Sequence, residues 1–390
     1  MFVMTPAKPS LHLLRSLTDE HVLRALITER RLTRAEIAAR TGISKPTIGE
    51  SVRRLTEAGL VHDTGERTTG RGRVGTYYAL GPDLAAALVV GIAPEGVVAE
   101  AVDVYGDVVA RRVEQVDRPA LPEQVADRLR TAAEEVLTDR AALAVVSAAD
   151  PVDRATGRLI RLPYAPFLIG ELSPAEVLAP LVDGPVVVDN DVNWAAATER
   201  VNASGARPRA DANGEVPDNF AYLYLGEGLG CAVVTEGEVR RGHRGLSGEV
   251  ADVLTCGPDG RAVRFIEVFT PLGLHQPDST AIDVPAVLAA VDGGPDDVLR
   301  ALAEAIAGVI AALIALDDPQ FVVLGGSWGQ HPAVVAAVTG ALSRQPRAVP
   351  VRPPLVTEEP ALAGARRRAV QELRTMLTRT TPGSDRTPSH

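Results

Sequence analysis

Three polar residues stand where an apolar run meets a helix-like segment. The stretch VVVDNDVNWAAATER, residues 186–200, places Asp189, Asn190 and Asp191 directly after three valines. Carboxylates and an amide at a strand end are suitable hydrogen-bonding partners for the vicinal hydroxyls of a polyol. Asp191 can also serve as the base that takes a hydroxyl proton in phosphoryl transfer. Alternatively, Asn190 or Asp191 only caps the helix that begins near Asn193.

Length and cysteine content limit the classes of protein to consider. The 390 residues predict roughly two to three domains, each long enough to bury a core. Cys231 and Cys256 are far apart in sequence, which excludes a disulfide framework and indicates a reduced, cytoplasmic setting. The longest uncharged apolar run, residues 305–316, is shorter than the ~18 residues that a membrane span needs. We therefore expect a cytoplasmic protein with no membrane partner.

Charge is distributed unevenly along the chain. Residues 1–80 contain 13 Lys and Arg against 8 Asp and Glu, whereas the whole chain has a formal net charge of −10. A basic head on an acidic body favours a head that binds a polyanion. Chance clustering of surface arginines is the alternative.

The basic head has the pattern of three helices. The segment SLTDEHVLRALITE, residues 16–29, has apolar residues near helical spacing. In LTRAEIAARTG, a capping box of Thr33 and Glu36 predicts a second helix. A third helix is predicted after Ser44 in SKPTIGESVRRLTEAG, where a proline in the first turn and a glycine at the end are favourable.

The third helix is predicted to present a small, polar and basic face outward, because Ile48, Val52 and Leu55 form its inner stripe. In a major groove, residues of the first turn reach base edges and arginines reach phosphates. The candidates for these DNA contacts are Ser44, Lys45, Thr47, Ser51, Arg53 and Arg54. The alternative is an ordinary three-helix bundle with a solvated charged face.

A basic loop follows the three helices. The stretch VHDTGERTTGRGRVGTYYAL predicts two short strands joined by a loop rich in Gly, Thr and Arg. Arg71 and Arg73 in this loop are further candidates for DNA contact, in a minor groove or along phosphates. Three helices and a basic wing are typical of a winged helix-turn-helix, which favours DNA binding over the plain bundle.

The acidic remainder predicts a two-lobed α/β body. Two consecutive hairpins in ALVVGIAPEGVVAEAVDVYGDVVARRVEQV are followed by a helix over residues 121–137 and the strand ALAVVSAA. Hairpin, helix and strand recur between FAYLYLGEGLGCAVVTEGEVRRG and Gly325. Two such units in succession predict two lobes with a cleft between them. The tail TTPGSDRTPSH, residues 380–390, is predicted to be disordered.

In this order, the motifs resemble the ROK family, which groups sugar-responsive repressors with sugar kinases. The resemblance rests on the winged helix-turn-helix followed by VDNDVNWAAATER, LGEGLGCAVVTEGEVRRGHRGLSGEVAD and DDPQFVVLGGS, and it covers residues 13 to about 375. It implies a DNA-binding domain over residues 1–82 and an actin-like (ribonuclease-H-like) body for ligand sensing and oligomerisation over residues 83–379. It also implies a homodimer or homotetramer.

The resemblance further implies a sugar site. Asn190 and Asp191 match the family's asparagine and catalytic aspartate, and Glu249 matches a glutamate that holds sugar hydroxyls. Glu267 is a more distantly spaced match to another sugar-binding glutamate, and Asp252 stands where the family commonly has a histidine. These five residues are the candidate ligand-binding residues.

The nucleotide-binding motifs depart from those of the family's kinases. The kinases carry Asp-x-Gly-x-Thr in the first hairpin, where GIAPEGV has Ala93 for the aspartate and Pro94, which lacks an N–H donor. Glu227 fills the threonine position of a second glycine-rich turn. A carboxylate about 4 Å from a phosphate charge costs roughly 4 kcal/mol at an effective dielectric near 20. The body is therefore expected not to be an enzyme, with Asp191 as the remnant of the kinase base.

Two other loops differ from the family pattern. Of the histidine and three cysteines with which the family commonly binds zinc, Cys256 alone is retained, so we expect neither a metal nor another cofactor. In SAADPVD, Ala148 and Asp150 replace glycines that the family usually presents to the sugar. This change narrows the pocket or alters which ligand it binds.

Taken together, these features predict a DNA-binding transcriptional regulator, with repression the commoner mode in the family. Its expected partners are a double-stranded DNA operator and a sugar or sugar-derivative effector. Two alternatives stay open. One is an ATP-dependent sugar kinase that retains a DNA-binding head, and the other is a ligand-independent regulator with a vestigial cleft.

Overall fold

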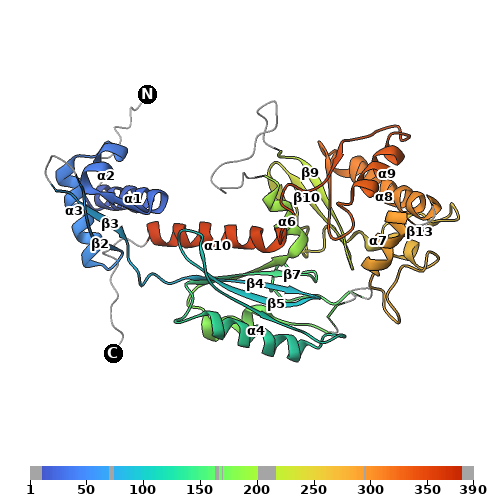
Figure 1. Cartoon of the computed structure of the whole chain (residues 1–390), viewed down its shortest axis with the longest axis horizontal. Helices are drawn as coiled ribbons and strands as arrows, with labels where there is room; N and C mark the ends of the chain where they lie inside the picture. The colour runs from blue at the N-terminus through green and yellow to red at the C-terminus, as the bar shows by residue number, and fades with distance from the viewer. Residues whose placement is uncertain are drawn as a thin grey trace, which may run out of the picture.

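A computed structural model describes residues 11–69, 74–162, 167–168, 170–200, 217–293 and 296–379, so the predicted disordered tail lies outside the described residues. The N-terminal head lies at one end of the molecule (Figure 1). It contains α1 (Leu11–Glu29), α2 (Arg34–Thr41), α3 (Lys45–Glu57) and a sheet of order β1–β3–β2, formed by β1 (Arg31–Thr33), β2 (Val61–Arg67) and β3 (Thr76–Leu80). Thr33 and Glu36 form the predicted capping box, and Ser44 caps α3. The winged helix-turn-helix prediction is confirmed.

The first lobe of the body is a five-stranded sheet of order β6–β5–β4–β7–β8. Its strands are β4 (Ala87–Ala93), β5 (Gly96–Val102), β6 (Val108–Glu114), β7 (Leu143–Ala148) and β8 (Val186–Asn190). The first three strands are antiparallel, and β7 and β8 run parallel to β4. Helix α4 (Pro122–Val136) covers one face, and α5 (Pro174–Leu178) with the short 3-10 helix η1 (Ala179–Leu181) precedes β8.

The second lobe repeats this topology in a sheet of order β11–β10–β9–β14–β15. Its strands are β9 (Phe220–Leu225), β10 (Leu229–Thr235), β11 (Glu238–Val239), β14 (Val322–Gly325) and β15 (Val351–Arg352). Again the first three are antiparallel and the last two parallel. The lobe also contains η2 (Val250–Asp252), β12 (Leu254–Cys256), β13 (Ala262–Arg264), η3 (Phe265–Phe269), α7 (Val284–Gly293), α8 (Asp296–Asp317) and α9 (Pro332–Leu342). The predicted duplication is confirmed.

Two helices cross between the lobes. Helix α6 (Asp191–Thr198) follows β8 of the first lobe, yet its Val192 and Ala195 pack in a cluster with Tyr222 of the second lobe. Helix α10 (Pro360–Arg379) follows the second lobe but lies against β4 and β7 of the first. The helices meet at Gly364, where an added Cβ would lie 2.2 Å from the carbonyl oxygen of Trp194. Crossed helices between duplicated lobes give the expected actin-like body.

Helix α8 is the one helix among the described residues that is long and apolar enough to cross a bilayer. Half of its most apolar window is buried inside the second lobe, where Leu302, Ile306 and Ile310 belong to the main hydrophobic cluster. This position in the core accounts for its composition.

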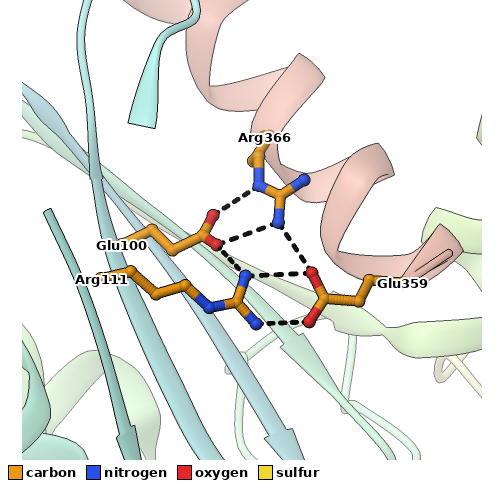
Figure 2. A network of polar contacts seen from close by, with 4 residues as sticks. All are labelled: Glu100, Arg111, Glu359 and Arg366. Atoms are coloured by element: carbon orange, nitrogen blue, oxygen red, sulfur yellow. Dashed lines mark hydrogen bonds and ion pairs between the residues drawn. The ribbon is translucent and has the colours of Figure 1, made fainter. Parts of the chain in front are cut away.

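Helix α10 is held to the first lobe by the ionic network that Figure 2 shows. The side chain of Glu100 on β5 is fully buried and forms ion pairs with Arg111 of β6 and Arg366 of α10. Glu359 binds both arginines from the start of α10. A buried carboxylate is strongly unfavourable unless it is paired in this way, so the network fixes the position of α10 on the sheet.

The same helix also reaches the contact between body and head. Arg374 of α10 donates hydrogen bonds to the carbonyl oxygens of Val104 and Tyr105, at 2.8 and 3.0 Å, in the turn between β5 and β6. Arg30 of the head binds Asp107 of this turn through two hydrogen bonds of 2.6 and 2.9 Å and lies over the ring of Tyr105. The head core and the side of the first lobe that faces α10 form one hydrophobic cluster. Head and body therefore share a packed interface.

Candidate functional site

The outer face of α3 is the candidate DNA-contacting surface of the head. Ser44, Lys45, Thr47 and Arg53 are all exposed on it. The hydroxyl of Ser44 lies 2.7 Å from that of Thr47, at the first turn. Arg53 forms exposed ion pairs with acidic neighbours one helical turn away on either side, at 3.0 and 2.7 Å. Exposed pairs contribute about 0–1 kcal/mol, so Arg53 can exchange them for a phosphate at little cost.

Two residues predicted for this face point elsewhere. Ser51 is fully buried and donates its hydroxyl proton to Asp19 of α1, so its predicted outward position was wrong. The reason is helical spacing, since residue 51 follows Ile48 by three positions and shares the inner stripe. Arg54 is partly buried, with its Nη2 atom 2.6 Å from Oδ1 of Asp19. Arg54 therefore links α3 to α1 instead of standing free on the outer surface.

The wing is described only in part. Arg71 and Arg73 lie outside the described residues, so their predicted contacts with DNA stay predictions. Arg67, at the end of β2, is exposed and pairs with Asp63 at 2.9 Å.

The candidate ligand site of the body begins at the ends of two neighbouring parallel strands. Ala148 of β7 lies opposite Asn190 of β8, so Asp150 and Asp191 leave the sheet at the same edge. The Nδ2 atom of Asn190 donates to the carbonyl oxygens of Ala148 and Asp150, both at 3.4 Å. Its Oδ1 atom accepts a 2.9 Å hydrogen bond from the amide of Val192. Asn190 is thus the N-cap of α6, as the simpler interpretation expected, and it also fixes the loop that carries Asp150.

Glu249 reaches this edge from the second lobe. Its neighbour Gly248 has a φ of 99°, and an added Cβ would lie 1.8 Å from the carbonyl oxygen of Cys231 on β10. The amide of Cys231 donates to the carbonyl oxygen of Gly248 at 2.9 Å. The preceding part of the loop is joined to the first lobe by a 3.1 Å hydrogen bond from the Arg154 amide to the Arg244 carbonyl. These contacts bring Glu249 to Asp150 and Asp191.

The three carboxyl groups form an acidic cluster, defined here as Asp150, Asp191 and Glu249. Burial raises the pKa of Asp150 to about 7, and the charges of the other two add to the effect. Burial also raises the pKa of Asp191 to about 7, with a further contribution from Glu95, and that of Glu249 to about 7, with a contribution from Asp191. The described residues provide no ion-pair partner for any of the three, although the Val192 amide donates a 2.7 Å hydrogen bond to Oδ1 of Asp191. The Oδ2 atom of Asp150 is buried without a hydrogen-bond partner.

Asp252 and Glu267 are both paired with Arg264, a cation that the acidic cluster lacks. Arg264 binds Glu267 through its Nη2 atom at 2.5 Å and its amide at 3.0 Å, and it lowers the pKa of that carboxyl. The Nη1 atom of Arg264 lies 3.4 Å from Oδ1 of Asp252, which is exposed. Strand β13 ends at Arg264, so the small β12–β13 hairpin brings a cation between the two acids.

The other half of the cleft contains the two turns that depart from the kinase motifs. Arg118 bridges them, with its Nη1 atom 2.7 Å from Oε2 of Glu227 and its Nη2 atom donating to the carbonyl oxygen of Pro94 at 3.2 Å. The ring of Tyr224 packs against Gly226 in the second turn. Arg118 lies in an irregular segment between β6 and α4, and no motif in the sequence identified it. In this half Arg118 is the protein partner of both the Glu227 carboxylate and the Pro94 carbonyl.

Metal ligation has no candidate in the described part of the chain. No group of three or more His, Cys, Asp or Glu side chains there is arranged to hold a metal ion. Cys231 and Cys256 are both free thiols, and burial raises the pKa of Cys231 to about 12.

Comparisons with known proteins agree with this architecture. Residues 15–62 match the model for winged helix-turn-helix DNA-binding domains, and residues 99–256 match the model of the ROK family. The chain is 30% identical over 183 residues to the bifunctional enzyme NanE/NanK of Brucella suis biovar 1, covering 45% of this chain but 32% of that protein. It is 28% identical over 268 residues to the glucokinase of Streptomyces coelicolor, covering 59% of this chain and 78% of that protein.

The similarity in fold extends over more of the chain. A crystal structure described as a ROK family transcriptional regulator, homolog of E. coli MLC protein, aligns with a TM-score of 0.61 at 18% identity. The alignment covers 94% of this chain and 99% of that chain. The fold and the cleft therefore define a winged helix-turn-helix joined to a two-lobed, actin-like body. Residues 99–256 of the chain carry a ROK family domain.

Proposed function

We propose that this protein is a cytoplasmic transcriptional regulator, a repressor, that binds a DNA operator through its head and a sugar-like effector through its cleft. In this proposal residues 1–82 form the DNA-binding domain, and residues 83–379 form a sensing and oligomerisation domain that transfers no phosphoryl group. The observation that carries the proposal is a winged helix-turn-helix packed onto a ROK body in which Glu227 is paired with Arg118, whereas Asp150, Asp191 and Glu249 have no cation among the described residues.

In the DNA complex, α3 enters the major groove. Ser44, Lys45 and Thr47, in its first turn, contact base edges, while Arg53 contacts the phosphate backbone. A homodimer or homotetramer presents two such helices to half-sites about one helical turn apart. The exposed ion pairs of Arg53 with Glu50 and Glu57 open on binding.

The absence of kinase activity is proposed from the half of the site that contains the turns at Pro94 and Glu227, here called the nucleotide half. Arg118 already binds Glu227 and the Pro94 carbonyl there, so a nucleotide phosphate must displace this ion pair and then lie beside the Glu227 carboxylate. Phosphoryl transfer depends on positive groups and N–H donors around the phosphates. The other half, here called the acceptor half, contains Asp150, Asp191 and Glu249, whose carboxylates can accept hydrogen bonds from hydroxyls. It can therefore bind a sugar-like ligand without the transfer of a phosphoryl group.

Effector binding is proposed to act on the head through the two crossing helices. Asp191 begins α6 in the cleft, and α6 contacts α10 at Gly364. Helix α10 in turn binds the β5–β6 turn through Arg374, and Asp107 of this turn binds Arg30 of the head. A ligand that favours one arrangement of the lobes therefore shifts the distance between the paired α3 helices.

DNA binding is tested by selecting sequences from random duplexes with the full-length protein and measuring affinity by fluorescence anisotropy at several salt concentrations. We expect the logarithm of affinity to fall linearly with the logarithm of salt concentration. Arg53→Ala should weaken binding to all sequences and reduce the salt slope by about 1, whereas Lys45→Ala and Thr47→Ala should change the preferred sequence. Unchanged binding in all three variants would overturn the assignment of α3 to the groove.

Sugar kinase activity is the second candidate function. It is favoured by the glucokinase relative and by the pKa of Asp191 near 7, which suits a general base at neutral pH. A coupled assay for ATP-dependent phosphorylation of monosaccharides distinguishes the two candidates. Turnover that disappears in Asp191→Asn would replace the regulator proposal by a kinase that binds DNA, whereas no turnover together with operator binding supports the regulator.

A further inference from the structure

The acidic cluster is not neutralised by the protein. Asp150 is only 3% exposed, and its Oδ2 atom has no hydrogen-bond partner. The neighbouring charges that act on its pKa are those of Asp191 and Glu249, which are also negative. A buried carboxylate without a partner is strongly unfavourable. A ligand that donates a hydrogen bond to this oxygen would therefore stabilise the site.

Three kinds of ligand can satisfy carboxylates: a divalent metal ion, a hydroxyl donor and an organic cation. A metal ion needs several ligand atoms at fixed geometry, and no suitable group of side chains exists among the described residues. A neutral hydroxyl donates a hydrogen bond but leaves the mutual repulsion of the carboxylates in place. A protonated amine supplies both donors and charge, and hydrogen bonds between charged groups are the stronger ones.

We propose that the effector is a polyhydroxylated amine of the amino-sugar class, bound with its ammonium group on Asp150. The inference rests on the proposed sensing function of the cleft and names the chemistry of its ligand. The ammonium donates to the Asp150 Oδ2 atom, and the hydroxyls donate to Asp191 and Glu249. Asn190 does not select the ligand, because both ends of its side-chain amide already bind the backbone.

The positions of the loops support this division of roles. Asp150 follows β7 on the loop held by Asn190, which places its carboxylate beside the first residue of α6. Glu249 approaches from the opposite lobe on the loop anchored at Cys231. A ligand held by carboxylates of both lobes bridges the cleft, so its charge also reduces the repulsion between the lobes.

The test uses matched ligand sets with the full-length protein at pH 7.5. Glucosamine, galactosamine and mannosamine are compared with their N-acetyl derivatives and with the three parent hexoses, by thermal shift and by calorimetry. We expect at least one free amine to bind about tenfold or more tightly than both of its neutral counterparts. The inference would be overturned if the neutral compounds bound as tightly as the amines. It would also be overturned if Ca²⁺ alone raised the melting temperature as much as the amines do.

Variants show whether Asp150 makes the selection. Asp150→Asn should remove the preference for the amine while retaining binding of the neutral sugars, because it deletes the charge and keeps the shape. Asp127→Asn is the matched control, since it removes one exposed carboxylate from α4 in the same lobe and should keep the preference. A preference that persists in Asp150→Asn would overturn the inference.

Operator binding is measured on the same samples, so that the two proposals fail separately. If the protein binds the operator but prefers neutral sugars, the regulator proposal stands and the amine proposal is rejected. If none of the nine compounds binds, the amine is also rejected, and operator binding then decides whether a regulator without a sugar effector remains. Release of the operator by the amine alone supports both proposals.

Discussion

The two halves of the candidate site differ in how their carboxylates are paired. In the nucleotide half, the Glu227 carboxylate is paired with Arg118, and the same guanidinium also binds the Pro94 carbonyl. In the acceptor half, Asp150, Asp191 and Glu249 have no cation among the described residues, and burial raises the pKa of each to about 7. The comparison teaches that one fold can pair one carboxylate with a cation and leave three others without one.

The largest expected effect of this difference is on the pH dependence of stability. Each carboxyl of the acidic cluster has a pKa of about 7 in the folded protein and about 4 when unfolded. Between these values the folded state binds more protons, so the free energy of unfolding falls as pH rises from about 4 to 7. We expect a loss of about 3 kcal/mol or more across this range, measured by urea unfolding at successive pH values. In Asp150→Asn the loss should be smaller, and an identical pH profile in that variant would contradict the role of the cluster.

The second expected effect is the stability of Asp150→Asn at a single pH. Because Asp150 is almost completely buried, removing its charge should raise the free energy of unfolding by about 1–3 kcal/mol at pH 7.5. Urea unfolding of the two proteins in parallel measures the difference. The gain should disappear at pH 4, where the aspartate is protonated in the folded protein, and a gain that remains there would indicate a packing effect.

Breaking the ion pair in the nucleotide half should have a smaller effect of opposite sign. The side chain of Arg118 is 44% exposed, so Arg118→Ala should lower the free energy of unfolding by less than about 1 kcal/mol. Calorimetric titration with Mg-ATP should show no binding in this variant, because Glu227 is then left without its cation. Tight ATP binding in Arg118→Ala would mean that the ion pair alone had blocked the nucleotide.

The smallest effects are expected outside both halves. Asp252→Asn and Glu267→Gln should change the affinity for an effector by less than about twofold, because both carboxylates are already paired with Arg264. Calorimetric titration with the same sugar panel measures this. A large loss in either variant would return that residue to the ligand site.

Much of this arrangement follows from local patterns in the sequence. Capping residues such as Thr33 and Ser44 mark helix starts through contacts within one turn, and the structure has both caps. The repeated hairpin, helix and strand order predicted the duplicated lobes. Asn190 and Asp191 were identifiable because they stand where a strand ends and a helix begins, and Glu249 was identifiable through the family resemblance.

Other features depend on contacts between distant segments and left no local signal. The pairing of Glu227 with Arg118 joins residues 109 positions apart, in segments that no motif connects. Asp252 and Glu267 had the right residue types, but the β12–β13 hairpin places Arg264 beside them. Ser51 was different, because a closer count of helical spacing would have placed it on the buried stripe.

The ionic network in Figure 2 also has a consequence for how the chain is made. Glu100 is synthesised 266 residues before its partner Arg366. At a synthesis rate of about 5–20 residues per second, roughly 13–53 s pass before that arginine exists. During this interval the face of the first lobe that α10 covers stays open, and one buried carboxylate lacks part of its counter-charge. The first lobe is therefore completed only after α10 has been synthesised and has left the ribosome.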